Sequence, residues 1–360
     1  MTHKYQQILD TLTGELASGK FEPNQKFPSE AALVRRFGAS RITVGRAVRE
    51  LQQQGLVERV AGSGTYVRNG DATPGQNLLL GLIIPDLGET EIFEPICQGI
   101  ANAPEAAHCG LLWPHSEPAG TGADRRVLQL SEQCIAHRVS GVFFAPVEYL
   151  SPSDDTNQRV LRMLDEAGIA VILLDRRPEE RGARRKYDLV GIDNRRAGFL
   201  AADHLMRLGA KRIGFVLYEG QASTARLRAA GCADATGSDL TFVLQPGGPF
   251  ELPEVAQDCD GFVCSNDRIA GRLMHALLAR KVRIPEDVRI VGIDDVNYAS
   301  LLPVPLTTIH QPCREIGETA LRSMLERLRR PHLPARDTLL DCELVIRQSC
   351  GAAPMRDSIL

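Results

Sequence analysis

Residues 27–67 read as two short amphipathic stretches, separated by a turn residue and followed by a glycine-tipped hairpin. Ser29 can cap a first helix, and Gly38 supplies the left-handed residue that ends it. The apolar side chains of this stretch share one helical face: Ala32, Leu33 and Phe37. With Ala39 as the turn, the stretch predicts the first helix of a helix-turn-helix.

The second amphipathic stretch begins at Ser40, a residue type that caps helices, and closes at Gly55. Its apolar residues recur at helical spacing: Val44, Ala47, Val48 and Leu51. Its first turns carry Arg41, Thr43 and Arg46. These residue types reach base edges and phosphates when the first turns of a helix enter the major groove. The stretch therefore predicts a recognition helix.

A hairpin follows, because residues 56–60 and 65–67 alternate as short strands around the tip Ala61-Gly62-Ser63-Gly64. Glycines allow such a tip to approach a phosphate backbone or a minor groove. The hairpin predicts the wing of a winged helix.

This part of the chain resembles the DNA-binding domain of the GntR family. The match consists of an N-terminal helix from Tyr5 to Ser18, then PSE, FGxSRxTVxxAxxxLxxxGL and GxGTxV. The resemblance implies a DNA-binding domain over residues 1–68, with these contact residues: Ser29, Glu30, Arg35, Ser40, Arg41, Thr43, Arg46, Gly62, Gly64 and Thr65. One departure is Gly45, where family members often carry arginine, and Arg46 is the candidate to replace it.

The basic residues are concentrated in the same part of the chain as the predicted winged helix. Residues 1–70 hold ten Lys and Arg against six Asp and Glu, whereas the other 290 residues hold 32 against 39. A winged helix used for protein contacts is the alternative. The arginines crowded on the helix pair favour DNA instead: Arg35, Arg36, Arg41 and Arg46.

Composition argues against several other classes of protein. The nine cysteines are scattered without a CxxC pair or a His/Cys cluster, so we expect reduced thiols, no metal and no cofactor. The N-terminus is polar, and no apolar run approaches the roughly 18 residues of a membrane span. We therefore expect a cytoplasmic protein without a membrane partner.

Residues 69–77, NGDATPGQN, are polar, contain Pro74 and two glycines, and predict a linker. Beyond it, nine apolar runs alternate with helical stretches: LLLGLIIP, CGLLWP, GVFFAP, AVILLD, LVGI, RIGFVL, LTFVLQ, GFVC and VRIVGID. Such runs are typical of strands buried on both faces of parallel sheets. Residues 78–360 are therefore predicted to form an α/β, doubly wound region with two lobes.

This second region resembles the ligand-binding domain of the Lac repressor and GalR family, which shares the periplasmic-binding-protein fold. The matching segments include VSGVFFAP, VGIDNRRAGFLAADHLMRLGAKRIGFV, TARLRAAG, GFVCSNDRIAG and LTTIHQP. The chain is shorter than the family between Gly231 and Phe262. With the GntR-like head, the whole chain resembles the arabinose repressor type of regulator.

The resemblance implies a ligand between the lobes, at the carboxyl ends of the strands. Arg196, Asn266 and Asp294 carry over from the effector-binding pattern, and their donors and acceptors suit the hydroxyls of a sugar. Gln311 and Glu148 lie on neighbouring predicted strand ends, and Phe93 is a candidate apolar face for the sugar ring. The alternative is structural: Asp294 can cap a helix, and Asn266 can turn a loop.

Enzyme motifs are missing from the sequence: there is no GxxxxGK[ST], no GxGxxG and no GxSxG. We therefore expect no catalysis. The two resemblances imply a transcriptional repressor that senses a small sugar or sugar derivative and binds a near-palindromic DNA operator as a homodimer. Two alternatives stay open. The region after the linker can sense a nucleotide or purine on the same fold, or it can only dimerise a DNA-binding protein.

Overall fold

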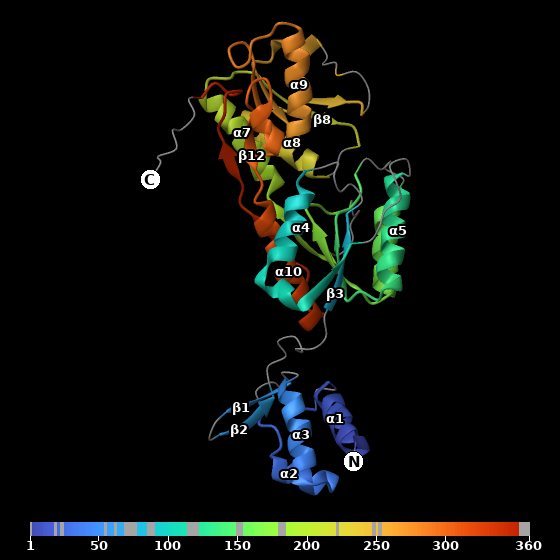
Figure 1. Ribbon diagram of the computed structural model, residues 1–360. Coiled ribbons are helices and arrows are strands. Elements are labelled where there is room, and N and C mark those ends of the chain that lie inside the picture. Colours follow the sequence, from blue (N-terminus) through green and yellow to red (C-terminus); the bar gives the residue numbers. More distant parts are fainter. Residues whose placement is uncertain are drawn as a thin grey trace. The chain divides into compact units, whose positions relative to one another are not determined.

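The structure is a computed structural model that describes residues 2–17, 20–21, 25–53, 56–60, 63–67, 78–84, 91–113, 122–148, 154–178, 185–220, 223–246, 250 and 254–352. The chain divides into two compact units, with the main boundary at Leu78 (Figure 1). The predicted linker, residues 69–77, lies outside the described residues. The domain bounds 1–68 and 78–360 therefore stay a prediction.

The first unit consists of three helices and a hairpin: α1 Thr2–Ala17, α2 Glu30–Phe37, α3 Arg41–Gln53, β1 Val57–Val60 and β2 Gly64–Val67. The two strands pair antiparallel, with Val57 opposite Val67. One apolar cluster joins all five elements: Ile8, Leu9, Leu12, Phe27, Leu33, Val44, Ala47, Val48, Leu51, Val57 and Val67. We call this unit the head.

Capping residues delimit the two helices as the sequence predicts. The Ser29 hydroxyl accepts a hydrogen bond from Ala32 N at 3.2 Å, and Gly38 ends α2 with φ of 55°. The Ser40 hydroxyl accepts from Thr43 N at 3.2 Å at the start of α3. These bonds satisfy N–H groups that have no partner within their helices. Gly55, the predicted end of α3, lies outside the described residues.

The second unit contains two six-stranded sheets, which we call lobe 1 and lobe 2. Lobe 1 has the strand order β13-β7-β6-β5-β3-β4 and is parallel in every pair for which a register is given. Its strands are β3 Leu78–Ile83, β4 Cys109–Leu112, β5 Gly141–Phe144, β6 Ala170–Leu174, β7 Asp188–Ile192 and β13 Asp337–Leu340. One face packs on α5 Ala123–Ala136 and α6 Thr156–Glu166. Helices α4 Phe93–Asn102 and α10 Cys313–Arg329 lie on the other side (Figure 1).

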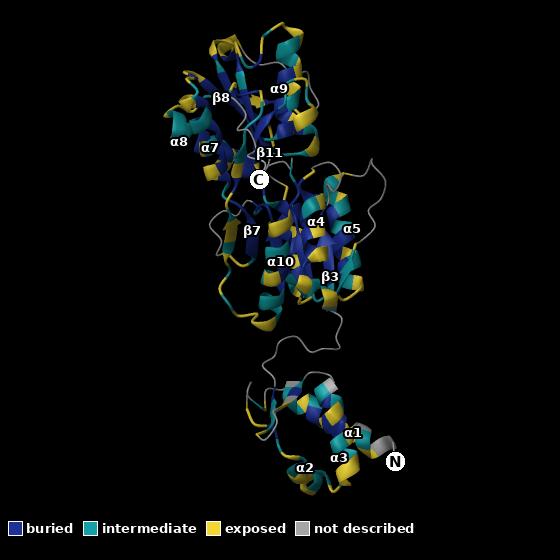
Figure 2. Ribbon diagram, turned by 60° about the vertical axis from the view of Figure 1, so that its left-hand side comes forward, coloured by how far each residue is buried: buried dark blue, intermediate teal, exposed yellow. Residues whose placement is uncertain are grey.

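Lobe 2 has the strand order β14-β12-β11-β10-β8-β9 and is parallel except for β14, which pairs antiparallel with β12. Its strands are β8 Ile213–Tyr218, β9 Thr241–Leu244, β10 Gly261–Cys264, β11 Arg289–Asp294, β12 Thr307–His310 and β14 Glu343–Val345. Helix α9, Asp267–Ala279, covers one face. Helices α7 Asn194–Arg207 and α8 Ser223–Thr236 pack against each other on the opposite side (Figure 2).

All nine apolar runs of the sequence are strands, β3 to β11, and their residues are largely buried (Figure 2). Among the described residues of the second unit, three further strands lie outside those runs: β12, β13 and β14. β13 has no buried residue and β14 is three residues long, so neither forms a long apolar run in the sequence. Between β9 and β10, the described residues contain one 3₁₀ turn, Glu254–Asp258, and no α-helix.

The chain passes between the lobes in three places: between β7 and α7, between β12 and α10, and between β13 and β14. These connections lie at Asp193, at Gln311–Pro312 and at Asp341–Cys342. Each connection is short, so the lobes can change their relative angle only about these few residues.

Candidate DNA-reading surface and effector site

Helix α3 presents an outward face that the head does not cover. Val44, Ala47, Val48 and Leu51 point into the core, and each is at most 4% exposed. The outward side carries these residues: Arg41, Ile42, Gly45, Arg46 and Arg49. The Arg41 side chain is 86% exposed, with its Nε 3.8 Å from Glu30 Oε2. Exposed cations on a helix face are typical of helices that enter the DNA major groove.

The arginine after Gly45 does not extend straight outward. The Arg46 guanidinium lies 4.6 Å from the ring centroid of Tyr5 in α1, a cation–π contact. A β-carbon on Gly45 would meet only the Glu30 carboxylate, whose Oε2 is 3.8 Å away, so the surface there is open. Arg46 thus lies toward α1, beside the open position rather than over it.

The other predicted DNA-binding residues divide into capping and exposed groups. Ser29 and Ser40 cap their helices, and the Thr43 hydroxyl is 2.8 Å from that of Ser40. Arg35 is exposed near the end of α2. No finding here tests whether any of these residues contacts DNA, so their roles stay predictions.

The wing is held to the head through its backbone. Phe27 N donates to Thr65 O at 2.8 Å, and Lys26 forms an isolated bridge with Tyr66. Gly64 has φ of 131°, where a side chain would be strained. Gly62, the other predicted tip residue, lies outside the described residues.

In lobe 2, close packing of α7 on α8 positions a buried arginine. A β-carbon on Gly198 would overlap the carbonyl oxygen of Arg228, and one on Gly231 would overlap that of Arg195. Only glycines permit the two backbones to approach in this way. The contact places the Arg228 side chain, 6% exposed, beside the N-terminus of α7.

Arg228 organises the carboxyl ends of the lobe 2 strands. Its Nε donates to Asn194 Oδ1 at 2.8 Å, and its Nη1 donates to Ser265 O at 2.6 Å. The same Nη1 is 3.3 Å from Asp294 Oδ1, which also accepts from Gln311 Nε2 at 2.7 Å. Residues from α7, α8, β11 and the segments after β10 and β12 therefore meet at one edge.

Asp294 is electrostatically strained in this position. Burial raises its pKa from 3.8 to about 7, although the Arg228 guanidinium acts in the opposite direction. Its φ is 131°, a conformation that side chains rarely adopt. Buried Asp267 lies nearby, accepting from Thr308 Oγ1 at 2.6 Å, and burial raises its pKa to about 6. Shifts of this kind concentrate at functional sites.

Lobe 1 contributes a matching cluster at the ends of β5 and β6. Arg176 Nη1 lies 2.8 Å from both Asp175 Oδ2 and Glu148 Oε1, and its Nε donates to Pro146 O at 2.7 Å. Its guanidinium lies 5.4 Å from the ring of buried Phe93 at the start of α4. Asp175 Oδ1 is buried without a hydrogen-bond partner among the described residues, and Asp175 has φ of 65°.

The two clusters influence each other across the lobes. The Asp175 carboxylate is among the charges that raise the pKa of Asp294, and both carboxylates raise that of Cys313. Ser223 Oγ at the start of α8 donates to Arg177 O in lobe 1 at 3.3 Å. An unsatisfied buried carboxylate oxygen in such a place calls for a donor from a ligand or water.

The structure brings together four of the predicted effector residues in two groups: Asp294 with Gln311, and Glu148 with Phe93. Arg196 lies elsewhere, at the lobe connections. Its side chain is 54% exposed, and its Nε binds Asp341 Oδ1 at 2.9 Å. The Asn266 side chain accepts from Ile269 N at 2.9 Å and caps α9. Arg196 and Asn266 therefore each have a structural role, and their roles in binding an effector stay predictions.

Three residues of the clusters were not predicted from sequence: Arg228, Asp175 and Arg176. The sequence contains a feature that could have identified each of them. Arg228 is an arginine among alanines and glycine in TARLRAAG, where no amphipathic pattern accounts for it. Asp175 and Arg176 follow directly after the buried run AVILL, at a strand end where binding residues are expected.

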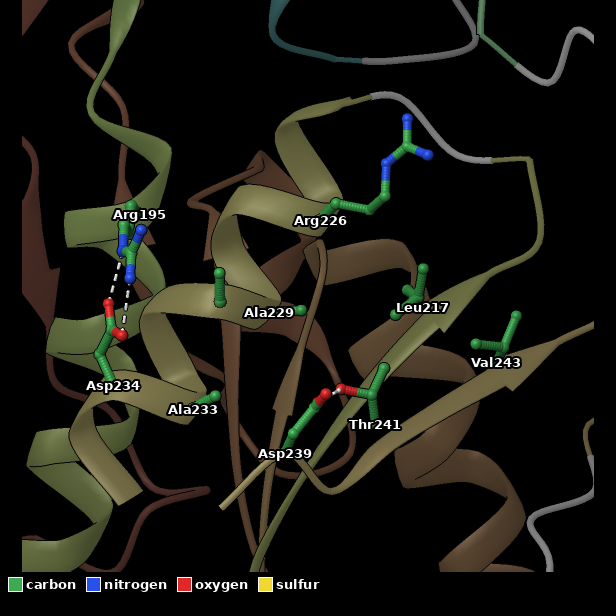
Figure 3. Close-up of a pocket in the computed structure, with 10 residues that line it drawn as sticks. Arg195, Leu217, Arg226, Ala229, Ala233, Asp234, Asp239, Thr241 and Val243 are labelled. Atoms are coloured by element: carbon green, nitrogen blue, oxygen red, sulfur yellow. Dashed lines mark hydrogen bonds and ion pairs between the residues drawn. The ribbon is translucent and has the colours of Figure 1, made fainter. Parts of the chain in front are cut away.

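A hollow of about 490 Å³ lies on the outer side of lobe 2, between α8 and the strands β8 and β9 (Figure 3). Its apolar lining consists of Ala229, Ala230, Ala233, Leu217 and Val243. Its rim is internally bonded, with Arg195 Nη2 2.7 Å from Asp234 Oδ1 and Thr241 Oγ1 2.7 Å from Asp239 Oδ1. This hollow is separate from the two clusters.

Comparisons with known proteins agree with the two-part architecture. Residues 4–67 match the family of bacterial regulatory proteins of the gntR family, and residues 202–350 match a periplasmic binding protein-like domain. The chain joins a GntR-type head to a periplasmic-binding-protein-like domain. The GntR-type head precedes all of the α/β region.

Several relatives share these parts. An arabinose metabolism transcriptional repressor of Geobacillus stearothermophilus is 27% identical, over 96% of this chain and 97% of that protein. The transcriptional repressor CytR of Escherichia coli K12 is 30% identical, over 46% of this chain and 52% of that protein. A LacI family regulator of Enterococcus faecalis, solved with bound ribose, has a TM-score of 0.62 at 27% identity, covering 77% of this chain and 100% of the other.

In the part of the chain that the structure describes, every helix is too short or too polar to cross a membrane. Within the same residues, no three His, Cys, Asp or Glu side chains are grouped so that they could hold a metal ion.

Proposed function

We propose that this chain is a DNA-binding transcriptional repressor whose affinity for its operator is controlled by a small sugar. The GntR-type head supplies the recognition helix, and the two-lobed domain supplies the sensor. The relatives support this proposal, because they are named as transcriptional repressors, and one solved relative holds ribose. Those names describe regulators, which supports a binding function rather than catalysis.

The observation that carries the sensor proposal is the pair of polar clusters at the strand ends of the two lobes. Arg228 with Asp294 and Gln311 belongs to lobe 2, and Arg176 with Asp175 and Glu148 belongs to lobe 1. Guanidinium and amide groups donate to hydroxyl oxygens, and carboxylates accept from hydroxyl hydrogens. Vicinal hydroxyls of a sugar satisfy both, and Phe93 beneath Arg176 fixes the position of that arginine.

Charge in these clusters favours an uncharged sugar over a sugar phosphate or a nucleotide. Three carboxylates, those of Asp175, Glu148 and Asp294, accompany two guanidinium groups. Both guanidinium groups are already bonded to carboxylates. A phosphate requires cationic donors that its own oxygens can use. A purine without phosphate is the second candidate, because Asp294 and Gln311 offer both an acceptor and an amide to a base edge.

The regulator is proposed to act as a homodimer in the cytoplasm. A single winged helix reads a short half-site, and a two-fold axis places two heads on a near-palindromic operator. In this proposal the two-lobed domains hold the dimer together.

Ligand is proposed to close the lobes about the three connections at Asp193, Gln311–Pro312 and Asp341–Cys342. Gln311 belongs both to a connection and to the Asp294 cluster, so contact with ligand acts on the hinge itself. Closure then changes the distance between the two copies of lobe 1 in the dimer, each of which follows a head. The two heads can then no longer reach their half-sites at the same time.

The test has two stages. A thermal-shift screen over pentoses, hexoses, sugar phosphates and nucleobases identifies ligands, because a compound that binds only the native state raises the unfolding temperature. Operator affinity is then measured with and without each hit. We expect an uncharged sugar to weaken operator binding, and by linkage the operator to weaken sugar binding by the same factor. Unchanged or tighter operator binding with every hit contradicts the repressor-and-inducer proposal.

A further inference from the structure

One large apolar side chain on the head is left almost fully in solvent. Ile42, the second residue of α3, is 82% exposed. Leu51 follows nine residues later, about two and a half helical turns, and therefore lies on the opposite side of the helix. Leu51 is fully buried in the head core, so Ile42 lies at the centre of the outward face.

The neighbours of Ile42 on that face leave it open. Residues three and four positions along a helix are its surface neighbours, and here they are Gly45 and Arg46. Gly45 has no side chain, and Arg46 lies toward Tyr5. Nothing on the outward face therefore covers the isoleucine, and the missing side chain at Gly45 allows an approaching surface to come close.

Single exposed apolar residues are common on proteins and by themselves need no explanation. The position of Ile42 is what distinguishes it. Arg41 precedes it, and Arg49 lies about two helical turns further along the same face. Both arginines are exposed and are suited to phosphates and bases. An isoleucine has no donor or acceptor, so it cannot read the hydrogen-bond pattern of a base pair. The one apolar group that standard bases present in the major groove is the 5-methyl of thymine.

We propose that Ile42 is a specificity-determining residue that packs on a thymine 5-methyl group in each operator half-site. The inference rests on the proposed function of the head as a DNA reader. An arginine at position 45 would make a polar contact with a base. In this chain the apolar contact of Ile42, about one helical turn earlier, takes its place. The half-site is then selected for a T·A pair at the position that faces Ile42.

The test uses DNA selected by the full-length protein from a randomised 24-base-pair duplex library. In the tightest duplex, each thymine is replaced in turn by deoxyuridine, which removes only the methyl group. We expect affinity to fall about fourfold at one thymine per half-site, since burying one methyl-sized group is worth about 0.8 kcal/mol. Ile42→Ala should bind the thymine and deoxyuridine duplexes equally at that position.

Arg49→Ala is the matched control from the same helix face. It should weaken binding to every duplex by a similar factor and keep the deoxyuridine effect. Circular dichroism checks that both variants keep their helix content, which is expected because both side chains are exposed.

Failure of the library selection would count against the proposed function itself. A selected duplex with no deoxyuridine effect, or one whose effect survives in Ile42→Ala, would overturn the assignment of Ile42 alone. If Ile42→Ala instead lowers self-association of the DNA-free protein and leaves the deoxyuridine series flat, Ile42 contacts a second copy of the chain and not DNA.

Discussion

Gly198 of α7 packs directly on the backbone of Arg228 in α8, so closely that a β-carbon on Gly198 would overlap the Arg228 carbonyl oxygen. Gly198→Ala must push the helices apart and displace the Arg228 guanidinium from Asn194 and Ser265. We expect a loss of about 1–3 kcal/mol in the free energy of unfolding, as for other overpacked cores. Chemical denaturation measures this loss.

Gly271→Ala is the control for that substitution. Gly271 lies inside α9, and a β-carbon there would meet only the two terminal methyl groups of Leu302, at 3.4 and 3.7 Å. Because alanine favours a helix over glycine by roughly 0.5–1 kcal/mol, this variant should be as stable as the natural chain or more so. Equal losses in the two variants would show that the α7–α8 contact is not special.

Arg228→Gln tests which arginine binds the effector. The variant leaves Asp294 without its cation, so we expect sugar affinity to fall by at least about tenfold, or about 1.4 kcal/mol. Operator affinity without sugar should be unchanged. Isothermal titration with the sugar found by thermal shift gives the first quantity, and operator titration gives the second.

Arg196→Gln is the matched variant, because Arg196 is the arginine that the sequence predicts to bind the effector. Its side chain is half-exposed and bound to Asp341, so we expect a smaller loss of sugar affinity than in Arg228→Gln. A larger loss in Arg196→Gln would mean that the sequence prediction is right and that Arg228 has only a structural role.

The free energy of unfolding should depend on pH because of Asp294 and Asp267. Burial raises their pKa values from 3.8 to about 7 and about 6 in the folded protein. At pH values between 3.8 and the raised pKa of each group, the folded chain holds a proton that the unfolded chain has lost. The stabilisation is therefore complete below about pH 4 and is lost as pH rises to about 7, at up to about 1.4 kcal/mol per pH unit for each proton.

Asp294→Asn should remove one of these protons and flatten the slope between pH 4 and 7. Denaturant unfolding at several pH values measures it. Asp287→Asn is the control, because hydrogen bonds from Arg283 lower the pKa of Asp287 to about 2, below this range. An unchanged slope in Asp294→Asn would show that another group titrates.

Arg41→Ala should weaken operator binding by roughly 1–3 kcal/mol and relax specificity at one base pair. Its side chain is 86% exposed, and Glu30 holds it only loosely at 3.8 Å. Competition between operator and scrambled DNA measures specificity. If the ratio of the two affinities matched that of the natural protein, Arg41 would contact phosphates and not bases.

Local patterns in the sequence determined much of this architecture. Ser29, Ser40 and Gly38 delimit the head helices because capping depends on bonds between residues only a few positions apart. The nine apolar runs form strands because a strand of a parallel sheet is covered on both faces. Such a strand therefore needs apolar residues at consecutive positions. The sequence of the head also indicated helix α3, the predicted recognition helix.

The tertiary structure alone decided which polar side chains meet. Arg228 and Asp294 are 66 positions apart, and they meet only because two glycines draw α8 onto α7 at the carboxyl edge of the lobe 2 sheet. Arg196 has a more suggestive sequence context, yet its place on α7 directs it to Asp341 at a lobe connection. β13 pairs with β7 from about 150 positions away, without an apolar pattern of its own. Such contacts follow from how helices and sheets pack, and packing depends on the whole chain rather than on neighbouring residues.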